Sequence, residues 1–178
     1  LNQPSHEWYD AYSAFSQAAS WAQDASLFYA LKTKYEGTPW WAWPESIRRR
    51  DKSAIDAAKA ELKPEIDTSC AALFLFERQW SEVRAYAAAR GVKLMGDMPI
   101  YVGLDSVDVW ADQGLFQLDD QGQPTHVAGV PPDAYSDTGQ RWGNPLFDWS
   151  AMAADGYGWW IRRIERMLMH CDSLRIVH

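Results

Sequence analysis

The sequence predicts an α/β protein, and two of its features support that prediction. Through residues 1–91, apolar side chains recur at intervals of three and four, which is typical of helices with one buried face. Two short apolar runs, Val92–Met95 and Leu174–Val177, have the length and composition of buried strands. Asp97 follows the first run, and a carboxylate where a strand ends indicates an α/β barrel, although a turn-forming Asp is the alternative.

The first half of the chain is expected to be mainly helical. Three helices are predicted, over residues 21–35, 45–62 and 65–90. Gly37 and Gly91 provide stop signals for two of these helices. The aromatic turn at 39–44 begins and ends with proline, which interrupts the helical periodicity. The third helix is the clearest of the three, and its buried face is expected to consist of Ile66, Cys70, Leu73, Phe76, Trp80, Val83 and Ala87.

The second half, residues 92–178, contains both predicted strands. Between them, residues 103–149 lack sustained periodicity, apart from a hairpin that would pair Leu115–Leu118 with Thr125–Ala128. Connections of this length are usually lids or binding loops. A helix from Tyr157 to His170 should precede the second strand, and its inward residues are expected to be Ile161, Ile164 and Leu168.

Charge and hydropathy exclude several classes of protein. The formal net charge of the 178 residues is -7, with only 17 Lys and Arg, which argues against a nucleic-acid partner. Arg48–Arg50 is the exception, but Asp51 follows it, and it is interpreted as a solvated helix face. No stretch approaches the roughly 20 apolar residues of a membrane span, and no leader is visible. We therefore expect no membrane association and a cytoplasmic location.

Cysteine use and aromatic content bear on the kind of ligand. Cys70 and Cys171 lack the spacing of a metal or redox site and are expected to be core thiols, and nothing indicates a cofactor. The chain has 11 Trp, whose rings can stack on sugars. Trp110 and Trp142, among Gly, Pro and Asp, are candidate ligand contacts. Four others follow helical patterns and are interpreted as core: Trp21, Trp80, Trp159 and Trp160. The proline-rich segment 129–136 suits a polyhydroxylated ligand, and a surface turn is the alternative.

A series of short segments resembles the amylomaltases, or disproportionating enzymes, which are 4-α-glucanotransferases of the α-amylase superfamily. The resemblance extends over nearly the whole chain, in the same order and at similar spacing. The segments are Trp43-Pro44 with Arg48, Gln79-Trp80, Gly96–Val102, Ser106–Trp110, Gly129–Asp133, Gly139–Pro145 and Trp159–Arg163.

The resemblance implies a partial (β/α)8 TIM barrel with a helical insertion, of which this chain contains only the regions of barrel strands 3 and 4. Residues 1–91 would be a mainly helical part of the catalytic domain with an inserted subdomain. Residues 92–178 would be part of the barrel, with 103–149 as a long substrate-binding loop. The implied activity transfers α-1,4-glucan segments between maltodextrins through a covalent glycosyl-enzyme intermediate, which requires two carboxyl groups about 5 Å apart.

The resemblance also implies roles for individual residues. Asp97 matches the acid that follows the third barrel strand, and Tyr101 lies beside it, both near the sugar at the cleavage point. Asp133, Tyr135 and Trp142 match positions of the substrate loop. These five residues are therefore expected to bind glucan.

The sequence departs from the family at its last strand. Residues 174–178 match a motif that in the family reads Arg-Ile-Asp-His, whose Asp is the nucleophile, and here that position is Val177. A branched hydrocarbon cannot attack an anomeric carbon, so double displacement has no route through this residue. Arg175 and His178 keep their matches and are expected to contact substrate. The family's acid/base Glu and third carboxylate belong to later strands, so we expect no intact catalytic centre in this chain.

Three hypotheses remain open from the sequence. The chain is part of a 4-α-glucanotransferase, or it is a non-catalytic α-glucan-binding relative or degraded gene product in which Val177 is genuine. The third is an interaction or structural domain that has kept only the fold.

Overall fold

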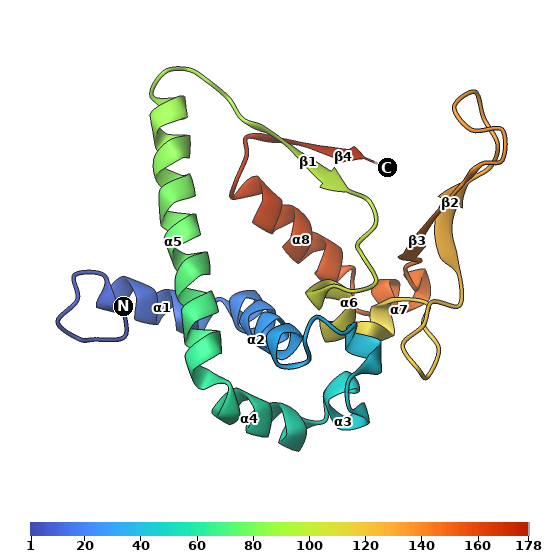
Figure 1. Ribbon diagram of the computed structural model, residues 1–178. Coiled ribbons are helices and arrows are strands. Elements are labelled where there is room, and N and C mark those ends of the chain that lie inside the picture. Colours follow the sequence, from blue (N-terminus) through green and yellow to red (C-terminus); the bar gives the residue numbers. More distant parts are fainter. Residues whose placement is uncertain (178) are drawn as a thin grey trace. The chain divides into compact units, whose positions relative to one another are not determined.

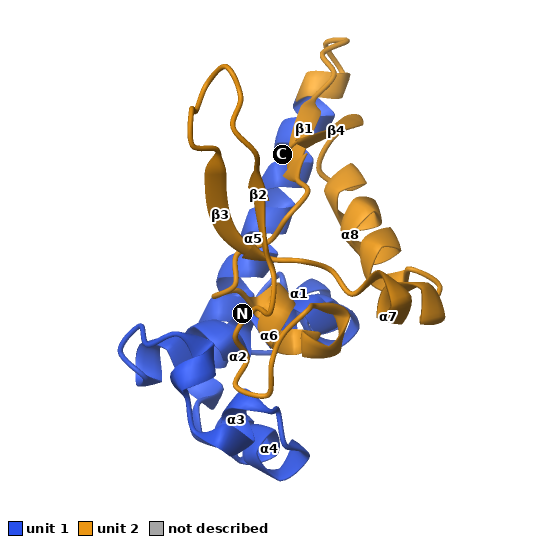
Figure 2. Ribbon diagram, turned by 90° about the vertical axis from the view of Figure 1, so that its right-hand side faces the viewer, with its two compact units in different colours: residues 1–86 blue, residues 87–178 orange. Residues whose placement is uncertain are grey.

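A computed structural model describes residues 1–177, which divide into two compact units (Figure 2). The first unit is Leu1–Tyr86 and the second begins at Ala87. All strands belong to the second unit (Figure 1). Within residues 1–177, no helix has both the length and the apolar character that a membrane span requires.

The first unit is helical. Its elements are α1 (Tyr9–Ala18), α2 (Ser20–Lys34), the 3-10 turn η1 (Trp40–Ala42), α3 (Glu45–Arg48), α4 (Lys52–Glu61) and most of α5 (Lys63–Ala88). Buried Leu27, Phe28 and Leu31 of α2 form part of its core. Trp40 and Trp43 are also buried, and the Trp43 ring lies 5.5 Å from that of Phe28. The aromatic turn therefore packs against α2 through Phe28.

The helix predicted over residues 45–62 is wrong in one respect, because the structure has two helices there. Arg50 adopts a left-handed backbone conformation, with φ of 59°, which ends α3 before α4 begins. Its guanidinium pairs with Asp24 at 2.6 Å. The interpretation of Arg48–Arg50 as a solvated face is also wrong for Arg48, which is buried. Periodicity alone does not reveal a single left-handed residue.

The longest predicted helix is confirmed, but most of its expected buried face is not. Cys70 and Phe74 are the buried residues of α5, and they pack with Tyr12 of α1. Phe76 and Val83 are about half exposed. Burial therefore follows the neighbours of the helix and not its apolar periodicity. Cys70 and Cys171 are buried free thiols, as predicted.

The second unit contains two parallel strands that lie near opposite ends of its sequence and pair with each other. The elements are β1 (Met95–Pro99), α6 (Val107–Ala111), η2 (Gln113–Leu115), β2 (Val127–Val130), β3 (Gln140–Pro145), α7 (Trp149–Ala154), α8 (Gly158–Leu168) and β4 (Ser173–Val177). β1 pairs with β4 in parallel (Figure 1). In this register Asp97 stands opposite Arg175. β1 begins later than predicted, so Asp97 lies in the middle of the strand and not after its end.

Two further expectations for this unit are corrected by the structure. The hairpin predicted between 115–118 and 125–128 is reduced to a turn with one bridge, Leu118 to Pro124. Instead, β2 forms an antiparallel hairpin with β3. In α8, Ile161 and Leu168 are exposed, whereas Trp159 is buried. The predicted inward face of α8 is therefore wrong for Ile161 and Leu168, whereas Ile164 is half-buried.

The β2–β3 hairpin requires glycine at position 129. A Cβ at Gly129 would lie 2.4 Å from the carbonyl oxygen of Gln140 on the opposite strand. We expect Gly129→Ala to lower the free energy of unfolding by about 1–3 kcal/mol, because the strands must separate. Urea denaturation measures this change.

Gly103→Ala is the matched control, because a Cβ at Gly103 would meet nothing within 4 Å. Its stability should be unchanged or slightly higher. Equal losses in the two variants would contradict the close approach of β2 and β3.

Candidate functional site

An ion pair joins the two parallel strands at the centre of the candidate site. Arg175 donates from Nε to Asp97 Oδ1 at 2.9 Å and from Nη2 to Asp97 Oδ2 at 2.5 Å. The side chain of Asp97 is 47% exposed and that of Arg175 is 64% exposed, so both can reach a ligand. Because side chains alternate along a strand, Val177 lies on the same face as Arg175.

The charges of this pair stabilise each other. Hydrogen bonds from Arg175 lower the pKa of Asp97 below its ordinary value, and Asp97 raises the pKa of Arg175. Asp97 is therefore ionised at neutral pH. A carboxylate has about four acceptor sites, so the two bonds to Arg175 leave acceptor capacity for further hydroxyl groups.

Tyr101 lies two residues after the end of β1, the strand that contains Asp97. The Ile100 N–H donates to the carbonyl of Val177 at 2.7 Å, which extends the pairing with β4. Asn144 of β3 donates from Nδ2 to the carbonyl of Val102 at 2.8 Å. The backbone on both sides of Tyr101 is thus held by other strands.

Aromatic contacts orient the Tyr101 ring. It stacks on buried Phe147, with ring centroids 6.0 Å apart and an interplanar angle of 16°. The Trp142 ring lies 6.4 Å from Tyr101, and its Nε1 donates to Gln140 Oε1 at 3.0 Å. The structure therefore brings together two of the predicted glucan contacts, Tyr101 and Trp142.

Asp133 and Tyr135 occupy the tip of the β2–β3 hairpin, which lies apart from the β1–β4 pair in Figures 1 and 2. Asp133 Oδ1 accepts hydrogen bonds from the N–H groups of Tyr135 and Ser136, at 2.8 and 3.0 Å. This local turn resembles the surface-turn alternative for the segment. The Tyr135 side chain is 93% exposed and points into solvent.

The sequence also singled out Trp110, Val177 and His178. Trp110, a candidate ligand contact, is completely buried in the short helix α6, so that interpretation was wrong. His178 lies outside the described residues. Val177, at the nucleophile position of the resembled family, is half-buried at the end of β4.

The supporting residues of the site were missed by sequence reasoning. Arg163 of α8 donates from Nη2 to the carbonyl of Pro99 at 2.7 Å, and Phe147 supports Tyr101. Asn144 is the third such residue. All three act through contacts distant in the sequence, and only Arg163 and Asn144 fall within segments that the resemblance had marked.

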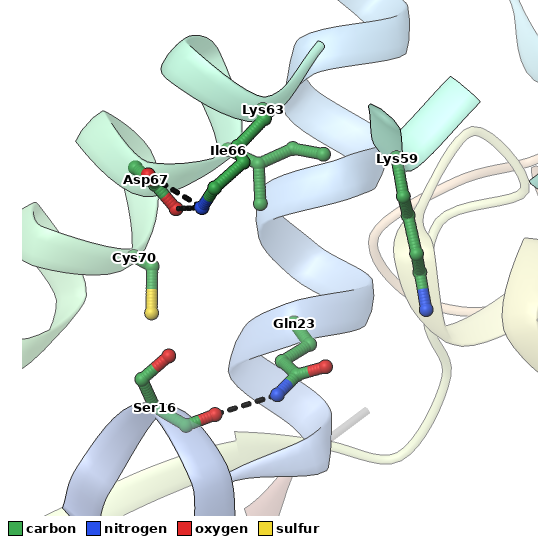
Figure 3. Close-up of a pocket in the computed structure, with 7 residues that line it drawn as sticks. All are labelled: Ser16, Gln23, Lys59, Lys63, Ile66, Asp67 and Cys70. Carbon is green, nitrogen blue, oxygen red and sulfur yellow. Dashed lines mark hydrogen bonds and ion pairs between the residues drawn. The ribbon is translucent and has the colours of Figure 1, made fainter. Parts of the chain in front are cut away.

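A separate cavity lies in the helical unit. Its volume is about 220 Å³. Figure 3 shows the residues that line it. Asp67 in its wall is paired with Lys63 at 2.8 Å, and Gln23 donates to the carbonyl of Ser16 at 2.6 Å. The cavity contains none of the predicted site residues. Over residues 1–177, no group of three or more His, Cys, Asp or Glu is arranged to hold a metal ion.

Two curated proteins are similar in sequence to most of this chain. The chain is 46% identical over 170 residues to a chloroplastic/amyloplastic 4-alpha-glucanotransferase of Oryza sativa subsp. japonica, covering 96% of this chain and 29% of that protein. It is 45% identical over 170 residues to a 4-alpha-glucanotransferase of Thermus thermophilus, covering 95% and 34%. The chain therefore spans about a third of the length of these relatives.

A solved structure, amylomaltase from Streptococcus agalactiae in complex with acarbose, matches with a TM-score of 0.92 and 37% identity. The match covers 97% of this chain and 35% of that one. It confirms the prediction of an α/β fold that forms part of a barrel. The family model described as 4-alpha-glucanotransferase matches residues 2–178. This chain belongs to the 4-alpha-glucanotransferase family.

Proposed function

We propose that the protein to which this chain belongs transfers α-1,4-glucan segments between maltodextrins, and that this chain supplies part of its glucan-binding site. The observation that supports the proposal most directly is the exposed Asp97–Arg175 pair on β1 and β4. Tyr101 and Trp142 follow as an aromatic pair. An ionised acceptor, the donors of a guanidinium and partly exposed aromatic rings are groups that bind sugar hydroxyls and sugar faces.

The proposed chemistry is a retaining double displacement. One carboxyl group attacks the anomeric carbon while a second protonates the leaving oxygen, and the second then deprotonates the acceptor hydroxyl. In the resembled family the nucleophile occupies the position of Val177. Asp97, paired with Arg175, would not be the nucleophile. It would accept hydrogen bonds from the sugar at the cleavage point. Tyr135 would contact glucan from the hairpin tip, where its ring is open to solvent.

A second candidate function is favoured by one observation, the hydrocarbon side chain at position 177. In that case the protein binds α-glucan without turning it over. Sequencing the source DNA across codon 177 and onward distinguishes the two functions. An Asp codon followed by further strands with carboxylates supports the transferase, whereas a genuine Val codon supports the binding protein.

A cytoplasmic location stays a prediction.

Asp97→Asn should weaken the binding of maltotetraose to this chain by about tenfold or more, because the amide replaces an ionised acceptor and loses the ion pair with Arg175. Isothermal titration calorimetry measures the affinity. The control is Asp56→Asn, which removes a more exposed ion pair, with Lys52, on α4. Equal affinities for the two variants would contradict a glucan contact at Asp97.

The pH dependence of binding follows from the lowered pKa of Asp97. Its ionised form persists as the pH falls to about 4, the ordinary pKa of Asp, so binding should be lost only below that pH. Arg175→Met removes the cause of the shift along with a proposed glucan contact, so binding should be weaker at every pH and the remaining affinity should be lost at a higher pH than in wild type. Affinities measured between pH 3 and 6 test this, and an unchanged profile would contradict it.

The purified 178-residue chain should not disproportionate maltotriose, because Val177 cannot form a glycosyl-enzyme bond. Chromatography of the products after long incubation is the measurement. Release of glucose together with longer maltodextrins would show that another residue acts as nucleophile.

A further inference from the structure

Arg163 of α8 binds the backbone at the point where β1 ends. Its Nη2 donates to the carbonyl of Pro99 at 2.7 Å, and its Nη1 lies 3.5 Å from the carbonyl of Ile100. The next residue along the chain is Tyr101. A guanidinium presents several donors in one plane, on separate nitrogens, so Arg163 can hold two consecutive carbonyls with its side chain in one fixed orientation.

The surroundings of Arg163 fix its side chain. Its guanidinium carbon lies 5.2 Å from the ring centroid of Trp159 and 5.3 Å from that of Trp160. Burial lowers the pKa of Arg163, while the negative charge of Asp108 on α6 raises it. A desolvated charge is costly unless it is hydrogen-bonded and offset by an opposite charge. The carbonyls, the indoles and Asp108 together meet that requirement.

The same indoles pack against Phe147, which in turn stacks on Tyr101. Trp159 and Trp160 lie 5.6 and 5.2 Å from Phe147, on which Tyr101 stacks. Arg163 is therefore linked to Tyr101 through two sets of intervening contacts. One passes through the backbone of residues 99 and 100, and the other passes through the rings of Trp159, Trp160 and Phe147.

We propose that Arg163 is a positioning residue, which fixes Tyr101 and the end of β1 in the orientation that binds the glucan chain. The proposal rests on the glucan-binding function proposed above for Asp97 and Tyr101. Arg163 contacts no sugar itself. Its effect on binding comes from restricting the segment that contains Tyr101, because a ligand must otherwise supply the energy of ordering that segment.

The test compares Arg163→Met and Arg163→Lys with the control Arg162→Met. Arg162 is adjacent on the same helix but exposed, so the control makes the same substitution outside the contacts. Two quantities are measured on the full 178-residue chain. One is amide hydrogen exchange, resolved for residues 100–102 and for α5 of the other unit. The other is affinity for maltotetraose.

We expect Arg163→Met to accelerate exchange at residues 100–102 about tenfold and to weaken binding by a similar factor, while exchange in α5 stays unchanged. Arg163→Lys, with charge but no planar set of donors, should fall between Met and wild type. Arg162→Met should match wild type in both measurements.

Other outcomes overturn the proposal or its basis separately. Wild-type exchange at residues 100–102 in Arg163→Met would overturn the positioning of this segment. Faster exchange with wild-type affinity would overturn its link to binding. Faster exchange in α5 of Arg163→Met would mean that this variant is destabilised as a whole. The test is then Arg163→Lys, and wild-type affinity in that variant would overturn the proposal. If the wild-type chain does not bind maltotetraose, the proposed function fails, whereas faster exchange in Arg163→Met would still support restriction of the Tyr101 segment.

Discussion

The parallel pairing of β1 with β4 is the interaction on which the candidate site depends. In this register Asp97 stands opposite Arg175, and the hydrogen bond from Ile100 to Val177 continues the pairing past the end of β1. A shift of one residue would turn every side chain of a strand to the other face and separate the ion pair. The pairing also fixes where the next segment begins, and with it the position of Tyr101.

Much of the fold could be predicted because local periodicity determines it. The long helix, the helix before β4 and β4 itself follow directly from apolar spacing. The break at Arg50 could not be predicted, since a single left-handed residue leaves no periodic signal. The partner of β2 was missed for a different reason. Strand pairing depends on contacts distant in the sequence, and segment 125–128 had a nearer candidate partner than β3. Exposure of α8 likewise depends on its neighbours.

The site shows a similar division between what sequence and structure reveal. The motifs identified Asp97, Tyr101 and Trp142 by their order and residue type. Their supports, Arg163 and Asn144, could not be identified by role, because both act on backbone carbonyls that any sequence provides. The exposed pair and the aromatic pair are suited to binding, whereas the chemical step requires carboxyl groups that this face lacks at the nucleophile position. The binding role and the chemical step are thus separate parts of the function proposed for this protein.

The most direct measurement of the central claim is an NMR titration of the Arg175 Nε–H resonance with acarbose, the ligand in the amylomaltase structure that this chain resembles. This group donates to Asp97 at 2.9 Å, so it reports on the ion pair itself. A glucan site on β1 and β4 predicts a saturable shift of this resonance, and loss of the shift in Asp97→Asn. A saturable response elsewhere in the chain with no change at Arg175 would contradict a glucan site on β1 and β4.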